Sequence, residues 1–383
     1  MSGPAQGPAR HGRGRADSEA QRALADLVGA IEVLVCTGSG GVGKTTTAAT
    51  LATEGARRGR RAAVVTIDPA RRLGDALGLG PGALGNEPVA VHGDWAGTLH
   101  ALVLDTPTTF DELVTRYSTD TRQAARILGN RFYQNISRTL SGTQEYMAGE
   151  KLYELYESGH FDLIVVDTPP TRDALDFLDA PGQLTRLLDH RVYRVLTAPG
   201  RGVARVVNRA AQVVVRAGAR VVGSDVVEDV VAFFAAFEGM EDGFRDRGER
   251  VRELLGSAST AFVLVASPRP DTVAEAAFFS ERLAERGLAV RSLVVNRMQP
   301  NFEASARPEA GRPDLAAGAP AALGALVRNL ADFRSVAARE EEVLRSLAAR
   351  VAPAPVVRVP LLDDDVHDLG GLARLRPHLV GGE

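Results

Sequence analysis

Residues 31–50 read IEVLVCTGSGGVGKTTTAAT, and they contain the most informative pattern in the chain. Its first part, Ile31–Cys36, is an apolar run with several β-branched residues, which predicts a buried strand. A glycine loop follows, and the Thr- and Ala-rich residues after it predict a helix from about Lys44 to Arg58. A strand, a glycine loop and a helix in this order indicate a phosphate-binding loop, the P-loop.

The glycine spacing supports this interpretation. Gly38, Gly43, Lys44 and Thr45 match the pattern G-x-x-x-x-G-K-[ST]. Glycines let successive backbone N–H groups surround a polyphosphate, where a Cβ would collide with it. We expect Lys44 to reach the β- and γ-phosphates and the Thr45 hydroxyl to ligate Mg²⁺. The nucleotide-binding residues predicted in the loop are Gly38, Ser39, Gly40, Gly41, Val42, Gly43, Lys44, Thr45 and Thr46.

The positions of the lysines also favour a phosphate-binding loop. The chain has Lys only at positions 44 and 151 and uses Arg at every other Lys/Arg position. A compact ammonium fits among phosphate oxygens where a planar guanidinium would not. Lys44 therefore favours a P-loop over a chance glycine turn.

Composition narrows the class of protein. A chain of 383 residues predicts one enlarged α/β domain or two smaller ones. The net charge of −3 provides no basic field, so nucleic-acid binding is not expected. The single cysteine, Cys36, excludes an intrachain disulfide or Cys-x-x-Cys clip and favours the cytoplasm. No apolar run approaches the length of a membrane span, and residues 1–17, rich in Gly, Pro and Arg, are expected to form a disordered tail.

Periodicity along the chain predicts an α/β fold with a mostly parallel central sheet flanked by helices. Further strands are expected at Ala62–Ile67, Thr98–Leu104, Phe161–Asp167, Ala261–Ala266, Ala289–Asn296 and Val356–Val359. Helices are expected at Ser18–Gly29, Thr108–Gly159 with two breaks, Arg172–Leu255, Thr272–Gly287 and Ala321–Ala352, and a loop at 78–97. We expect one P-loop domain at 18–376 with an inserted helical subdomain in two segments, about 106–160 and 182–256, and a C-terminal tail at 377–383.

Two strands end in aspartate. Asp167 ends FDLIVVD, the Walker B arrangement that holds Mg²⁺ directly or through water, and the TPPT that follows it resembles a switch loop. Asp68 follows Ala62–Ile67, where a strand meets the crevice in which open α/β sheets bind ligands. Because Asp68 precedes a proline, it could equally begin a helix as its N-cap. From the residues alone, both interpretations of Asp68 stand.

The long helical region contains two segments with different residue patterns. Leu184–Val222 alternates Arg with apolar residues, and Val226–Phe237 is strongly apolar on one side. Such helices either receive a partner, lipid or client, or bury their apolar faces in a core of their own. The second interpretation is favoured because most amphipathic helices do so.

Taken in order, six motifs resemble the arsenite-pump ATPase family (ArsA type), which includes the tail-anchored protein targeting ATPases, within the deviant Walker A class of P-loop proteins. They are GSGGVGKTT, TIDPARRLGDAL, GTQEYMAGEKL, IVVDTPPTRDALDFLDAP, VVNR and VPLLDDDVHDLGGL. The similarity covers about residues 25–376 and is closest to an actinobacterial branch thought to work as paired subunits. It implies an Mg·ATP-dependent ATPase that works as a nucleotide-gated dimer, whose helical subdomain couples hydrolysis to a protein or membrane-associated cargo.

The resemblance also implies roles for single residues. Lys44, Asp68 and Asp167 would be catalytic, with Asp68 as the switch I aspartate that orients the attacking water and Asp167 as the switch II aspartate. Thr45, Asp68 and Asp167 would hold the metal. Asn296 and the Val359–Leu361 loop would hold the adenine, and the residues expected to bind the nucleotide on this side are Asn296, Arg297, Pro360 and Leu361. The side chain of Asn296 has a donor and an acceptor side by side, which suits an adenine edge.

The chain departs from the family at position 39. Ser39 stands where the signature lysine is expected, a cation that in relatives stabilises charge on the partner's nucleotide and can be worth ~10³-fold in rate. That cation could come from a heterodimer partner, from another basic side chain such as Lys151, or from nowhere. The alternative to a self-sufficient ATPase is therefore a regulatory ATP-binding subunit of a heterodimer with a lysine-bearing paralogue.

The chain departs from the family in two further ways, which concern the dimer and the binding of a hydrophobic client. The chain lacks the Cys-x-x-Cys that ties some relatives into a zinc dimer. Only Met147 and Met240 fall in the helical regions, which weakens a methionine-lined groove and with it a targeting chaperone for hydrophobic segments. Arsenite transport is the least supported, because Cys36 alone cannot form a multi-thiolate site.

Overall fold

A computed structural model describes residues 12–68, 72–139, 143–169, 224–237, 239–300 and 321–382. The strands are β1 (Val33–Gly38), β2 (Arg61–Thr66), β3 (Val89–Val91), β4 (Thr98–Val103), β5 (Leu163–Asp167), β6 (Thr260–Ala266), β7 (Val290–Met298) and β8 (Val356–Pro360). The helices are α1 (Gly12–Ala30), α2 (Lys44–Arg57), α3 (Arg72–Ala76), α4 (Thr106–Tyr117), α5 (Thr121–Leu128), α6 (Arg131–Thr139), α7 (Thr143–Glu157), α11 (Ser224–Phe237), α12 (Glu241–Gly256), α13 (Pro270–Glu285), α14 (Ala321–Val351) and α15 (Leu369–Val380).

The strands of this part of the chain form one eight-stranded sheet in the order β3-β4-β2-β5-β1-β6-β7-β8. Only the edge strand β3 runs antiparallel, beside β4. The central strands are buried on both faces, which explains why they read as continuous apolar runs in the sequence. The α/β fold with a mostly parallel sheet is therefore confirmed.

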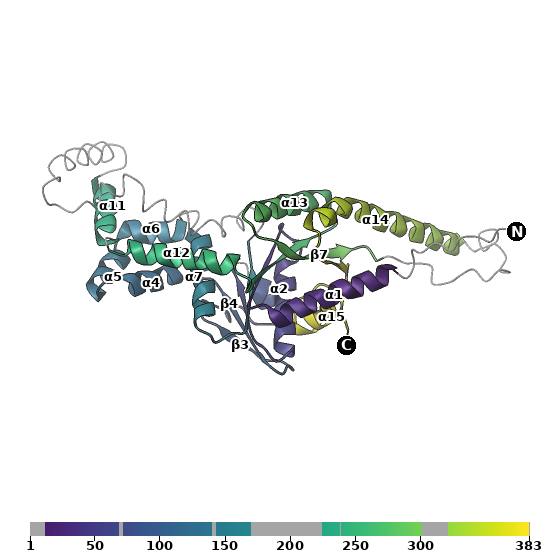
Figure 1. Ribbon diagram of the computed structural model, residues 1–383, viewed down its shortest axis with the longest axis horizontal. Helices are drawn as coiled ribbons and strands as arrows, with labels where there is room; N and C mark the ends of the chain where they lie inside the picture. Colours follow the sequence, from purple (N-terminus) through teal and green to yellow (C-terminus); the bar gives the residue numbers. More distant parts are fainter. Residues whose placement is uncertain are drawn as a thin grey trace.

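Alternate residues of β1 show the two faces of the sheet. Val33 and Val35 belong to one buried cluster, and Leu34 and Cys36 belong to the other. Helices α1, α2 and α15 cover the Leu34 face, and α7, α12, α13 and α14 cover the Val33 face (Figure 1). The result is three layers, with the sheet in the middle.

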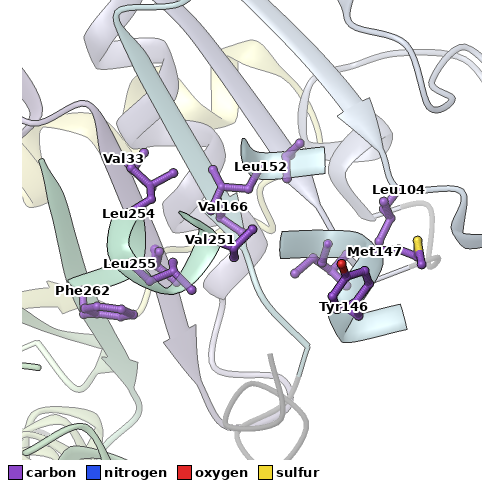
Figure 2. Packing of buried hydrophobic residues seen from close by; sticks show 14 of the residues in the cluster. Val33, Leu104, Tyr146, Met147, Leu152, Val166, Val251, Leu254, Leu255 and Phe262 are labelled. Atoms are coloured by element: carbon purple, nitrogen blue, oxygen red, sulfur yellow. The ribbon is translucent and has the colours of Figure 1, made fainter. Parts of the chain in front are cut away.

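The helices α4, α5, α6, α11 and α12 gather at one end of the molecule, beyond the sheet (Figure 1). This group and the sheet share a buried cluster. Figure 2 shows Leu152 of α7 together with Val251 and Leu254 of α12, near Val166 of β5 and Phe262 of β6. The helical subdomain is therefore attached to the sheet through apolar packing by α7 and α12.

The structure corrects three expectations at the periphery. Residues 12–17, assigned to a disordered tail, begin α1, where Arg15 pairs with Glu19 and Asp17 with Arg358 of β8. Residues 377–380, assigned to a C-terminal tail, complete α15, because Leu379 continues its buried face. Within the expected loop at 78–97, β3 pairs with β4, a strand of three residues that is too short for periodicity to detect.

Two predictions lie outside the described residues: residues 1–11 of the tail and the basic stretch at 184–222. Among the helices that are described, none combines the length and the apolar character needed to span a bilayer.

Candidate nucleotide-binding and active site

The P-loop lies where the strand order reverses. It joins β1 to α2, and β1 lies between β5 and β6, so a crevice opens at the carboxyl ends of these strands. At Gly43 the backbone is left-handed, with φ +93°, and a Cβ there would lie 2.3 Å from Nδ2 of Asn296. Only glycine meets both constraints. This explains the second glycine of the motif.

A cavity of about 450 Å³ opens above the loop. Eleven of the predicted site residues line it, and nine of them are Gly40, Gly41, Gly43, Lys44, Thr45, Thr46, Asp68, Asn296 and Arg297. Pro360 and Leu361, at the end of β8, line it as well. Residues that lie far apart in the sequence therefore meet at one concave site, large enough for a nucleotide.

Lys44 begins α2 and is only 8% exposed. Its Nζ donates to the backbone carbonyl of Ser39 at 2.8 Å, which holds the ammonium beside the loop. Burial lowers the pKa of Lys44, while the negative charges of Asp167 and Asp68 raise it. An incoming polyphosphate would compensate this buried charge further.

Asp167 ends β5 and is almost fully buried. Its Oδ2 accepts hydrogen bonds from the hydroxyls of Thr45 at 2.6 Å and Thr66 at 2.9 Å. The parallel register sets these contacts, because Asp167 lies beside Cys36 of β1 and Thr66 of β2. Burial raises the pKa of Asp167, and the hydrogen bonds from Thr45 and Thr66 oppose that rise.

The residues present fit Mg²⁺. The second oxygen of Asp167, Oδ1, is buried and has no hydrogen-bond partner among the residues that the structure describes, and the Thr45 hydroxyl lies next to the same carboxylate. Among the described residues, no three His, Cys, Asp or Glu side chains come together as a metal cluster. Mg²⁺ needs no such cage, because it binds through one or two carboxylates plus substrate phosphates.

Asp68 follows β2 and faces the cavity. Its backbone N–H donates to Oγ1 of Thr66 at 3.3 Å, and the preceding carbonyl, of Ile67, accepts from Nε2 of Gln144 at 2.7 Å. Arg72 and Asp75 of α3 line the same cavity as Asp68. Of the two interpretations of Asp68, the geometry favours the position at the ligand crevice.

Asn296 ties β7 to the P-loop. Its Nδ2 donates to the carbonyl of Val42 at 2.9 Å, and its Oδ1 accepts from the backbone N–H of Arg297. Arg297 has a left-handed backbone, φ +61°, and its Nη1 donates to the carbonyl of Gly41 at 3.0 Å. An amide has two N–H donors and two oxygen lone pairs, so these two contacts use one donor and one lone pair of Asn296.

Four predicted residues do not line the cavity. Asp167 lies beneath it, under Thr45. The Cβ position of Gly38 faces the backbone of Val265 of β6, and Val42 is part of the core. Ser39 is buried, and its Oγ donates to the carbonyl of Thr272 in α13 at 3.4 Å. The side chain at the signature-lysine position therefore points into the body of its own chain.

Lys151 does not supply the missing cation. It lies in α7 with 1% of its side chain exposed and is not among the cavity residues. Its Nζ lies 3.2 Å from a carboxylate oxygen of Glu154, 3.6 Å from Glu87 and 3.8 Å from Glu112. Three carboxylates of the surrounding elements hold this ammonium in a structural cluster.

Sequence reasoning missed part of the cavity wall. The additional lining residues are Arg72, Asp75, Ala76, Thr168, Leu362, Asp364, Asp365, Val366, His367 and Leu375. Most of them lie in TIDPARRLGDAL and VPLLDDDVHDLGGL, two motifs that directly follow strands. That position was the available signal, because side chains just beyond parallel strands converge on the crevice.

Comparisons with known proteins agree with this site. A family model described as anion-transporting ATPase matches residues 31–310. The chain is 26% identical to ATPase GET3 of Malassezia globosa over 265 residues, which covers 69% of this chain and 72% of that protein. It is 25% identical to an ATPase ASNA1 homolog of Trypanosoma cruzi over 370 residues, 90% of this chain and 89% of that one. An uncharacterized protein of Streptomyces coelicolor is 30% identical over 273 residues, 70% of this chain and 63% of that one.

Proposed function

Because this chain belongs to the anion-transporting ATPase family and is therefore an ATPase, we propose that it hydrolyses Mg·ATP at the cavity above the P-loop. In this proposal it works in the cytoplasm as a nucleotide-gated dimer, and its helical subdomain transmits the cycle to a protein or membrane-associated cargo. It forms one ATPase domain into which the helical subdomain is inserted.

One observation carries the catalytic part of the proposal. The Thr45 hydroxyl and the buried Asp167 carboxylate meet at 2.6 Å beside the buried ammonium of Lys44. When bound there, Mg²⁺ would neutralise charge on the β- and γ-phosphates. Lys44 would bind the same phosphates, and Asp68, on the rim, would orient the attacking water.

The chemistry is a hydrolysis. The water oxygen bonds to the γ-phosphorus, and the bond from that phosphorus to the β–γ bridging oxygen breaks. ADP leaves with the bridging oxygen, inorganic phosphate forms, and the surplus proton passes to solvent. The role of the chain is to position the reactants and to stabilise charge, which is where most catalysis of phosphoryl transfer lies.

A contact between the subdomain and the site supports coupling. Gln144 in the first turn of α7 donates to the carbonyl of Ile67, one residue before Asp68. Because α7 also packs into the core of the helical subdomain, a displacement at Asp68 would shift α7 and the helices that contact it. Met147 and Met240 are buried in that core, which gives no support to a methionine-lined client groove.

Dimer composition depends on position 39. ATPases of this family dimerise, and the Streptomyces relative supports placing this chain near an actinobacterial branch of paired subunits. Because Ser39 is buried against α13, it offers no cation to a partner. This observation favours a second candidate, a regulatory subunit that closes on ATP and depends on a lysine-bearing paralogue for turnover.

Phosphate release from Mg·ATP, measured over a series of protein concentrations, tests the proposal, with Lys44→Ala as the inactive control. A specific activity that rises with concentration and is lost in the control supports a self-sufficient dimeric ATPase. Binding of ATP without turnover at any concentration would overturn that function. The regulatory subunit would then be the better description.

A further inference from the structure

If the chain turns over ATP alone, as proposed above, a cation must replace the one that Ser39 lacks. Among the described residues that line the cavity, the arginine and lysine side chains are Lys44, Arg72 and Arg297. Lys44 already has the P-loop role. The choice therefore lies between the two arginines.

Arg297 is engaged elsewhere. Its Nη1 donates to the carbonyl of Gly41, and it follows Asn296 on the side of the cavity formed by the ends of β7 and β8. To reach a γ-phosphate it would have to give up the bond that ties it to the loop. Its geometry suits the support of the P-loop backbone.

Arg72 lies on the opposite wall, beside the switch aspartate. Its Nη1 is 3.7 Å from Oδ2 of Asp68, longer than a hydrogen bond, and its side chain is 65% exposed. The guanidinium is therefore only loosely held and can turn towards an anion in the cavity.

We propose that Arg72 is a catalytic residue that binds the γ-phosphate from within the same chain and supplies the charge that Ser39 cannot. A guanidinium donates two parallel N–H bonds to two phosphate oxygens, a geometry that an ammonium lacks. When Arg72 moves to the phosphate, it gives up only this weak contact with Asp68. No bond to Arg72 forms or breaks, because its contribution is electrostatic. A cation at this point can be worth ~10³-fold in rate.

The experiment compares Arg72→Gln with Arg72→Lys and with a matched control, Arg345→Gln, an exposed arginine of α14 that pairs with Glu342. Two quantities are measured: kcat and KM for ATP, and affinity for Mg·ADP with and without aluminium fluoride, which mimics the phosphate in transfer. We expect Arg72→Gln to lower kcat ~10²–10³-fold and to abolish the gain in affinity from aluminium fluoride, with affinity for Mg·ADP within twofold of the parent chain. Arg72→Lys should retain part of both, and the control should retain all.

Mixing inactive chains tests whether the arginine acts within its own chain. A mixed dimer of Arg72→Gln and Lys44→Ala has one site with Lys44 intact and Arg72 present only across the interface. No recovery of turnover supports action in the same chain, and recovery would overturn it. Unchanged kcat and aluminium fluoride affinity in Arg72→Gln would overturn the proposal altogether. If the parent chain proves inactive alone, the aluminium fluoride measurement still decides the role of Arg72 separately.

Discussion

Replacing Arg247 with methionine should destabilise the helical subdomain by about 3–5 kcal/mol, because it leaves a buried carboxylate without its countercharge. Arg247 lies in α12, and its Nε donates to Oε2 of Glu150 in α7 at 2.9 Å. Both side chains are almost fully buried. A second bond, from Nη1 to Glu157 at 2.7 Å, reaches a carboxylate that is 50% exposed. The guanidinium also lies 4.2 Å from the ring centroid of Tyr153.

These contacts of Arg247 contribute unequally to the free energy of unfolding. The half-exposed Glu157 pair contributes under about 1 kcal/mol, since solvent screens it. The contact with the Tyr153 ring contributes about 0.5–1 kcal/mol. The largest effect is on Glu150, whose Oε1 already has no hydrogen-bond partner in the described structure. Methionine fills much of the lost volume, so the expected deficit is chiefly electrostatic.

The deficit should depend on pH. Burial raises the pKa of Glu150, and first the Tyr146 hydroxyl and then the charge of Arg247 oppose that rise. Without Arg247 the folded-state pKa rises further above the ordinary value of 4.5. The folded chain then binds a proton that the unfolded chain has released, so stability falls as the pH rises above about 4.5. The variant should therefore lose more stability at pH 8 than at pH 5.

Urea unfolding followed by far-ultraviolet circular dichroism at pH 5, 6.5 and 8 measures this. The only tryptophan, Trp95, packs with the opposite face of the sheet, so its fluorescence would not report on α7 and α12. The matched control is Glu150→Gln combined with Arg247→Met, which removes both charges and should recover most of the loss. Any of three results would show that Arg247 does not stabilise the buried Glu150 carboxylate. They are a deficit below about 1 kcal/mol, equal deficits at all three pH values, and no recovery in the double variant.

Three further predictions concern other sites. Lys151→Met should lower the free energy of unfolding by about 1–2 kcal/mol, because three carboxylates lose their shared cation. The folded variant should release phosphate with the kcat of the parent chain. A tenfold loss of kcat would contradict a structural role for Lys151. Gly43→Ala should weaken binding of a fluorescent ATP analogue at least tenfold. The new Cβ would lie 2.3 Å from the Asn296 amide, and it would sit on a left-handed backbone. Unchanged affinity would show that the loop adapts. Arg61 lowers the pKa of Asp162 to about 2, so Asp162 contributes stability above pH 3.8 that is lost as the pH falls towards 2. Asp162→Asn should therefore lower Tm at pH 7 by a small amount, since the pair is exposed, and the gap to the parent chain should close near pH 2; a constant gap would argue against this linkage.

The residue pattern predicts the α/β class of fold, which the structure confirms, and it predicts the place of the candidate site. The P-loop is readable because it is local: glycine spacing, a preceding apolar strand and a following helix all lie within residues 31–50. The apolar runs that end in Asp68 and Asp167 are local in the same sense. Where the signal was too short, as in β3, or depended on docking against another element, as at the two ends of the chain, the sequence prediction was wrong.

What each of these side chains faces depends on contacts between segments that are distant in the sequence. Ser39 and Thr272 are 233 positions apart, and Asn296 and Val42 are 254 apart, yet each pair is joined by a hydrogen bond. Lys151 is paired because α7, α4 and the 78–97 region pack together, which no local pattern records. The environment of a side chain is set by elements distant in the sequence. Residue types and spacing therefore predict where phosphate binds, and only the packed chain tells which cations remain free to act there.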